Sequence, residues 1–149
     1  MLAIPLSSIG QMQCGVSTPS DIEGPFYKAG APARASLAEP GPKAEKLMLT
    51  GVVYSRDCKP LPGVTLDFWH ANDRGEYDNS GYRYRLETNL PPPYSGRPRH
   101  VHVKVQRPGG KALTTQLYFP GESRDADRAL VVKMERGEGG RRAVFDFVL

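Results

Sequence analysis

The chain lacks the features that define several protein classes. It has only two cysteines in 149 residues, too few for the disulfide framework of a small secreted domain. No window reaches the roughly 18 apolar residues of a membrane-spanning helix. Lys and Arg form no dense basic block, so the formal net charge of +4 does not indicate nucleic-acid binding. We therefore expect neither a nucleic-acid partner nor a membrane.

The sequence leaves the cellular compartment open. Residues 1–9 are mildly apolar, but they lack the basic start, long apolar region and small-residue cleavage motif of a signal peptide. Cys14 and Cys58 are compatible with a disulfide in an oxidising compartment and equally with two separate thiols. A cytoplasmic and a secreted protein are both consistent with these observations.

Glycine and proline are plentiful and fall between short apolar runs. The 16 glycines and 14 prolines favour strands joined by turns over a helical bundle. We predict one domain, an all-β antiparallel β-sandwich with long active-site loops and little helix. Residues 1–46 are expected to form an irregular segment that packs on a sandwich of residues 47–149. The expected strands are 47–54, 64–70, 82–89, 100–106, 113–119 and 143–148, and 124–135 fits either a short helix or a strand.

Two of the three histidines, His100 and His102, lie close together. They open the alternating run His-Val-His-Val-Lys-Val, so both imidazoles are expected on one face of a strand. Two imidazoles on a rigid strand can form half of a metal site. Such a pair taken alone is more often structural, so the interpretation depends on what completes the site.

Two tyrosines are the candidates to complete it. Tyr77 lies between two glycine-containing turns and Tyr94 follows three prolines, so both are expected in loops beside the histidine strand. Two phenolates and two neutral imidazoles form a hard, anionic donor set that suits a trivalent ion better than zinc. Fe(III) is acidic enough to deprotonate tyrosine, whose free pKa is about 10. Each tyrosine alone is equally compatible with ordinary packing.

The chain resembles the intradiol ring-cleavage dioxygenases, the family of catechol and protocatechuate dioxygenases. The resemblance extends over nearly all of the chain from Thr18 onward. Its most specific parts are Arg-Pro-Arg-His-Val-His at 97–102 and Thr-Thr-Gln at 114–116. The other matching segments are 18–27, 61–72, 75–79, 93–94, 117–121 and 140–147.

This resemblance implies a non-haem Fe(III) cofactor whose metal ligands are Tyr77, Tyr94, His100 and His102. It also implies that Arg97 and Gln116 flank the bound substrate and that Tyr94 takes part in catalysis as a base. The implied reaction is cleavage of a catechol by O₂ between its two hydroxylated carbons, which gives a cis,cis-muconate-type product. The expected partners are a small-molecule catechol and O₂, and a homo-oligomer stays open.

Three neighbouring residues receive no catalytic role. His70 matches a non-ligand position of the family, and we expect an ordinary hydrogen-bonded strand side chain there. Trp69 is assigned to the core, and Arg99 stands at a position where the family commonly varies.

Two alternatives remain. The family's outgoing strand and hairpin turn between the two ligand tyrosines are not recognisable here. Their absence favours a catalytically inactive ligand-binding β-sandwich, and residues 51–64 also resemble transthyretin-like and carboxypeptidase regulatory domains. A zinc-dependent hydrolase built on His100 and His102 is the second alternative, although no acidic third ligand occurs at motif spacing.

Overall fold

The computed structural model describes residues 15–25, 27, 45–69, 74–79, 83–93, 96–122, 125–137 and 139–149. For residues 74–79 and 125–127 it describes the backbone alone. The elements within these ranges are β1 Lys46–Tyr54, β2 Val64–Trp69, β3 Arg74–Asn79, β4 Arg83–Asn89, β5 His100–Gln106, β6 Ala112–Tyr118, the 3₁₀ helix η2 Asp125–Leu130, β7 Lys133–Gly137, β8 Gly140–Val144 and β9 Phe147–Val148.

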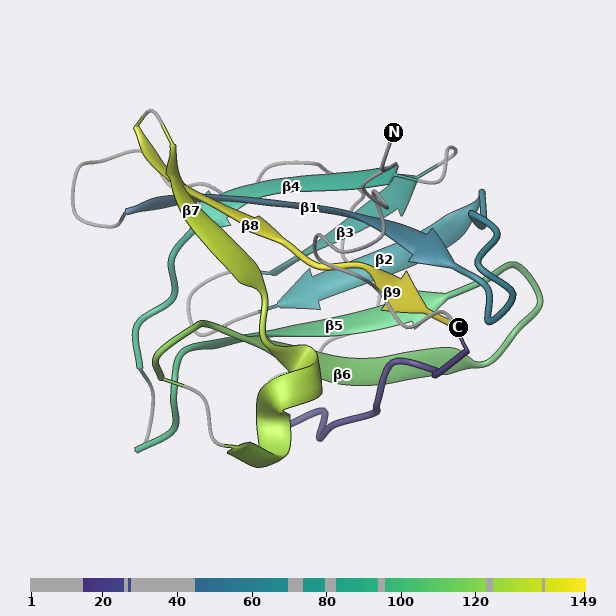
Figure 1. The fold of residues 1–149 in the computed structure, drawn as a ribbon, viewed down its shortest axis with the longest axis horizontal. Coiled ribbons are helices and arrows are strands. Elements are labelled where there is room, and N and C mark those ends of the chain that lie inside the picture. Colours follow the sequence, from purple (N-terminus) through teal and green to yellow (C-terminus); the bar gives the residue numbers. More distant parts are fainter. Residues whose placement is uncertain are drawn as a thin grey trace, which may run out of the picture.

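The strands form two sheets layered over one core (Figure 1). One sheet has the order β4-β1-β8-β7, with β9 also pairing with β1, and the other has the order β3-β2-β5-β6. The predicted all-β fold is confirmed, but the sheets are not purely antiparallel, because β1 pairs in parallel with β8 and β9. Both sheets contribute apolar side chains to the buried core, among them Leu49, Phe68, Val103 and Phe147.

The predicted single strand at 143–148 is wrong, because the chain breaks between β8 and β9. Asp146 turns its carboxylate to the backbone, and its Oδ1 accepts a hydrogen bond of 2.9 Å from the amide of Val52. The Tyr84 hydroxyl donates a 2.6 Å hydrogen bond to the Phe145 carbonyl. Gly51 makes room for this carbonyl, since a Cβ there would lie 1.8 Å from the Phe145 oxygen.

The segment around Tyr77 also differs from the prediction. The sequence predicts a loop between two turns, whereas the structure has strand β3, which pairs antiparallel with β2. The β3 sequence, Arg-Gly-Glu-Tyr-Asp-Asn, is mostly polar and has weak strand propensity. We attribute the strand to pairing with β2, whose backbone N–H and C=O groups would otherwise be unpaired along this edge. The sequence of residues 124–135 fitted either a short helix or a strand. The structure has both in succession, the helix η2 and then strand β7.

Cys58 lies in the turn after β1 and is disulfide-bonded. The chain's other cysteine, Cys14, lies outside the described residues. No helix in the described part of the chain is long and apolar enough to span a bilayer.

Candidate active site

The two histidines of β5 occupy the centre of the four-stranded sheet. His102 lies between Trp69 of β2 and Gln116 of β6, and His100 lies opposite Tyr118. The two imidazole centroids are 4.9 Å apart and their planes are 82° to each other. The predicted strand 100–106 is confirmed, and it brings both rings together on the face away from the core valines.

Both imidazoles are held in the neutral form that a metal requires. Nδ1 of His100 lies 2.8 Å from the Pro98 carbonyl, which can only accept, so Nδ1 carries the proton and Nε2 offers a lone pair. Burial lowers the pKa of His100. Burial, followed by the nearby His100, lowers the pKa of His102 to about 4. At neutral pH each ring therefore has a lone pair available for a ligand bond.

Aromatic rings and an N-terminal segment cover His102. We call residues 15–25 and 27 the N-terminal strap. Trp69 stacks on His102 with centroids 4.9 Å apart and planes at 5°, and Tyr27 of the strap packs on Trp69 at 4.7 Å. Gly24 approaches the same imidazole so closely that a Cβ there would lie 3.2 Å from Cε1. His102 is consequently only 7% exposed, and its Nδ1 has no hydrogen-bond partner among the described atoms.

Lys104 also holds the strap in place next to the stacked rings of Trp69 and His102. Lys104 lies two residues after His102 on β5, and its ammonium group forms an ion pair with Glu23. The same nitrogen lies 4.3 Å from the centroid of the Tyr27 ring, within the range of a cation–π contact. These contacts hold the end of the strap over the histidine face.

Arg97 and Gln116 meet on the same face of the sheet. Nη2 of Arg97 donates a 2.7 Å hydrogen bond to Oε1 of Gln116 and a 3.2 Å hydrogen bond to the Tyr118 hydroxyl. Nε2 of Gln116 donates in turn to the carbonyl of Ile22 in the strap, at 2.9 Å. Arg97 is half-buried and Gln116 is fully buried, so a fixed positive charge lies beside the two neutral imidazoles.

Comparisons with known proteins indicate one family. A family model described as a dioxygenase matches residues 22–93. The catechol 1,2-dioxygenase of Acinetobacter baylyi is 32% identical over 148 alignment positions, gaps included, and the match covers 71% of this chain and 47% of that protein. The catechol 1,2-dioxygenase of Pseudomonas sp. strain EST1001 is 30% identical over 166 alignment positions, gaps included, and the match covers 84% of this chain and 55% of that protein.

Solved structures show the same relationship. The dioxygenase domain of a dioxygenase carbohydrate-binding protein fusion from Streptomyces sp. SirexAA-E is 41% identical with a TM-score of 0.84, covering 90% of this chain and 98% of that domain. The chain belongs to the intradiol ring-cleavage dioxygenase family. Within that family, catechol 1,2-dioxygenase from Pseudomonas arvilla C-1 is 29% identical with a TM-score of 0.72, covering 89% of this chain and 62% of that one. The chain spans about half the length of the curated relatives that it matches.

The described part of this intradiol family member contains four of the six predicted site residues with their side chains. His100, His102, Arg97 and Gln116 share one face, whereas Tyr94 lies outside the described residues. Tyr77 has its backbone on β3 opposite Leu66, a core residue, and its side chain is not described. The ligand roles of the two tyrosines therefore stay predictions from the sequence motif. His70 also lies outside the described residues.

The two described histidines have the chemistry that a ferric ion of the kind implied by the family would need. Among the described residues, no three or more His, Cys, Asp or Glu side chains lie where they could share a metal ion. The predicted set differs from such a cluster, because two of its four members are tyrosines. The histidine half of that set has the required chemistry: two adjacent neutral rings, one with a carbonyl fixing its tautomer and one with an unpartnered buried nitrogen.

Several residues of this face were missed by the sequence reasoning. Trp69 is buried at 2% exposure, but it is not part of the apolar core cluster and instead stacks on His102. The contact of Trp69 with His102 could have been predicted only from the register of β2 against β5, which the sequence does not specify. Asp21 and Tyr118 belong to matching segments of the family, yet nothing in their spacing predicts that they meet.

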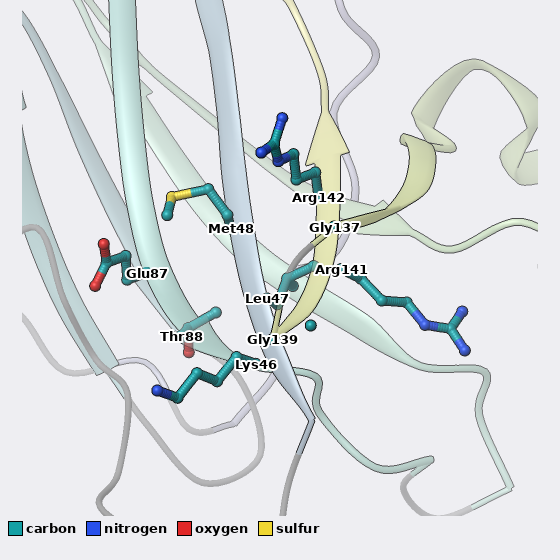
Figure 2. A pocket seen from close by; sticks show the side chains of 10 residues that line it. Lys46, Leu47, Met48, Glu87, Thr88, Gly137, Gly139, Arg141 and Arg142 are labelled. Atoms are coloured by element: carbon teal, nitrogen blue, oxygen red, sulfur yellow. The ribbon is translucent and has the colours of Figure 1, made fainter.

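A separate hollow of about 320 Å³ lies at the end of the other sheet, where β1 and β4 meet the β7–β8 hairpin (Figure 2). None of the predicted site residues lines it. Its lining consists of Lys46, Leu47, Met48, Glu87, Thr88, Gly137, Gly139, Gly140, Arg141 and Arg142.

Proposed function

We propose that the protein is a non-haem ferric intradiol dioxygenase that cleaves a catechol-type ring between its two hydroxylated carbons. One observation supports this most directly: two neutral, buried imidazoles lie side by side, and the hydrogen-bonded pair of Arg97 and Gln116 lies on the same face. Family membership and the catechol and chlorocatechol 1,2-dioxygenases among its relatives support the substrate class.

In this proposal Tyr77, Tyr94, His100 and His102 hold the Fe(III) ion. Two phenolates offset two of its three positive charges, which favours the ferric over the ferrous state. When bound, the ion supplies the Lewis acidity that binds a doubly deprotonated catechol and makes its ring reactive toward O₂.

The protein's own groups then orient and stabilise the substrate. The phenolate oxygen of Tyr94 would accept one of the two catechol hydroxyl protons, and a hydroxide from solvent would accept the other. The guanidinium of Arg97 keeps its charge throughout and stabilises the negative charge that develops on the ring during oxygen attack. The strap excludes water from the buried side of His102. Both oxygen atoms enter the product, so a catechol and O₂ yield a muconic acid with no further co-reactant.

Oxygen uptake by the iron-loaded protein tests this proposal. Catechol, protocatechuate, hydroxyquinol and chlorocatechols are supplied in turn, and the products are analysed by mass spectrometry after reaction under ¹⁸O₂. We expect at least one substrate to consume one O₂ per ring and to give a ring-opened diacid that carries two ¹⁸O atoms. Binding of these phenols without oxygen uptake would instead identify a ligand-binding sandwich.

Arg97→Met and Arg99→Met form a matched pair for the role of the guanidinium. Arg99 lies two residues away and contacts Glu122 and the Pro91 carbonyl, outside the cluster around Gln116. We expect Arg97→Met to lower kcat about 10²-fold, a typical loss for one electrostatic donor, and Arg99→Met to retain kcat within a few-fold. Equal kcat in the two variants contradicts the role given to Arg97.

A further inference from the structure

A buried hydroxyl connects the strap to Arg97. The Tyr118 oxygen lies 2.7 Å from Oδ2 of Asp21, 3.1 Å from Oε1 of Gln116 and 3.2 Å from Nη2 of Arg97. Tyr118 is fully buried, and Asp21 belongs to the strap and is half-buried. We call these four residues the Tyr118 cluster. Three of them come from the sandwich, and only Asp21 reaches the cluster from the N-terminal side.

The donors and acceptors of the cluster determine which way its hydrogen bonds point. Within the cluster, the single hydroxyl proton of Tyr118 can go to the Asp21 carboxylate or to the Gln116 amide oxygen. The carboxylate is charged and closer, so the proton points to Asp21. With its proton on that side, the Tyr118 oxygen accepts the hydrogen bond from Arg97. Gln116 likewise keeps its Oε1 for Arg97, because its Nε2 donates to Ile22.

The strap does not depend on this carboxylate for its attachment. Backbone groups, hydroxyls and one side-chain amide hold it to β6 and to the C-terminal strand. The hydrogen bonds are Thr18 N to Val148 O at 2.9 Å, Val148 N to Thr18 Oγ1 at 2.8 Å, Asp21 N to Thr114 O at 2.9 Å, Thr115 Oγ1 to Pro19 O at 2.7 Å and Gln116 Nε2 to Ile22 O at 2.9 Å. The strap, which is the purple segment in Figure 1, runs along β6. The Asp21 carboxylate therefore serves something other than attachment alone.

We propose that Asp21 is a positioning residue for Arg97, acting through Tyr118. Its carboxylate takes the tyrosine proton, so that the phenolic oxygen and Gln116 together fix the guanidinium in one orientation on the histidine face. The consequence for catalysis rests on the proposed function, whereas the fixed orientation of Arg97 does not.

Asp21→Asn is the sharpest perturbation of this arrangement. Oδ1 of Asp21 already accepts a 2.7 Å hydrogen bond from the amide of Ile22, which keeps the oxygen of the new amide on that side. The amide nitrogen then replaces Oδ2 and donates to Tyr118. The tyrosine proton must turn to Gln116, where it competes with Arg97 for Oε1. Tyr118→Phe removes the same link by deleting the hydroxyl.

The first readout is the guanidinium itself, in protein without iron. In ¹⁵N-arginine-labelled protein we expect the Nη resonances of Arg97 to show slowed rotation, because two acceptors hold them. Asp21→Asn and Tyr118→Phe should speed this rotation at least tenfold. The matched controls are Asp57→Asn, an exposed acid in the turn after β1, and Tyr54→Phe at the end of β1, and both should leave it unchanged.

The second readout is steady-state kinetics of the iron-loaded enzyme. We expect each of the two variants to lower kcat on the order of tenfold, less than outright removal of a charge-stabilising donor, with KM nearly unchanged. The two losses should not add in the double variant, because both act through one hydrogen bond. In an Arg97→Met background, Tyr118→Phe should have no further effect on kcat.

The possible outcomes separate the two proposals. Faster Arg97 rotation in both variants supports positioning even if no ring-cleavage activity is found, and in that case only the proposed function fails. Unchanged rotation in both variants, or losses of kcat that simply add, overturns the role of Asp21 while leaving the proposed function intact.

Discussion

Gly24 offers a direct test of how closely the strap presses on the histidine pair. Its φ of +74° lies in the left-handed region, and a Cβ there would lie 3.2 Å from Cε1 of His102. Gly24→Ala therefore introduces two separate costs, backbone strain and crowding of the imidazole. Gly109→Ala is the matched control, because Gly109 has a φ of +70° and nothing lies within 4 Å of its added Cβ.

The two costs can be estimated separately. A non-glycine residue in the left-handed region loses about 1–2 kcal/mol, and both variants share this loss. Crowding of a packed site costs about 1–3 kcal/mol more, which falls on Gly24→Ala alone. His102 cannot move freely, since Trp69 stacks on its ring. The difference between the two variants in free energy of unfolding should thus be about 1–3 kcal/mol.

Urea unfolding of the iron-free proteins measures this difference, and iron titration measures its functional consequence. We expect Gly24→Ala to bind Fe(III) about tenfold more weakly than Gly109→Ala, because the added methyl group displaces His102. A tenfold loss of affinity corresponds to about 1.4 kcal/mol of binding free energy. Equal free energies of unfolding in the two variants would refute the close contact between the strap and the ring.

Three further changes test the packing around this site. Tyr84→Phe should lower the free energy of unfolding, measured in urea at pH 7, by about 1–3 kcal/mol, because the Phe145 carbonyl loses its buried hydrogen-bond donor. Burial raises the pKa of Tyr84 well above 10, so the wild type should lose more stability than this variant as the pH rises through about 10. Gly51→Ala should cost about 4 kcal/mol or prevent folding, since its Cβ would lie 1.8 Å from the Phe145 oxygen, whereas Gly15→Ala, with open space, should leave the melting temperature unchanged. Lys104→Met should cost about 1 kcal/mol or less in urea, because its ion pair to the strap is partly exposed, and a loss of several kcal/mol would contradict that estimate.

The sequence predicts those parts of the fold and site that depend on local pattern. Strand β5 was placed at its observed bounds, because its alternation of histidine or lysine with valine is unambiguous. The family motif predicted that Arg97 and Gln116 flank the substrate. The structure joins the two side chains by a hydrogen bond, and their roles toward a substrate stay predictions.

The parts that sequence reasoning missed depend on long-range contacts. Strand β3 has a polar sequence and forms through its pairing with β2, so no periodicity predicted it. Asp21 and Tyr118 are 97 residues apart and meet because the strap runs along β6. Trp69 is buried as predicted, but its stacking on His102 depends on the register of β2 against β5, which the sequence did not predict. The break at Asp146 needed knowledge of which amide lies opposite its carboxylate.

The central claim is that two phenolates and two imidazoles bind one ferric ion, and visible spectroscopy of the reconstituted protein tests it most directly. We expect one Fe(III) per chain and a broad tyrosinate-to-iron charge-transfer band that colours the protein red-brown. His102→Ala should abolish both, and His70→Ala, the matched histidine control, should retain both. A reconstituted protein that stays colourless, or a His102→Ala protein with the full band, contradicts the assignment.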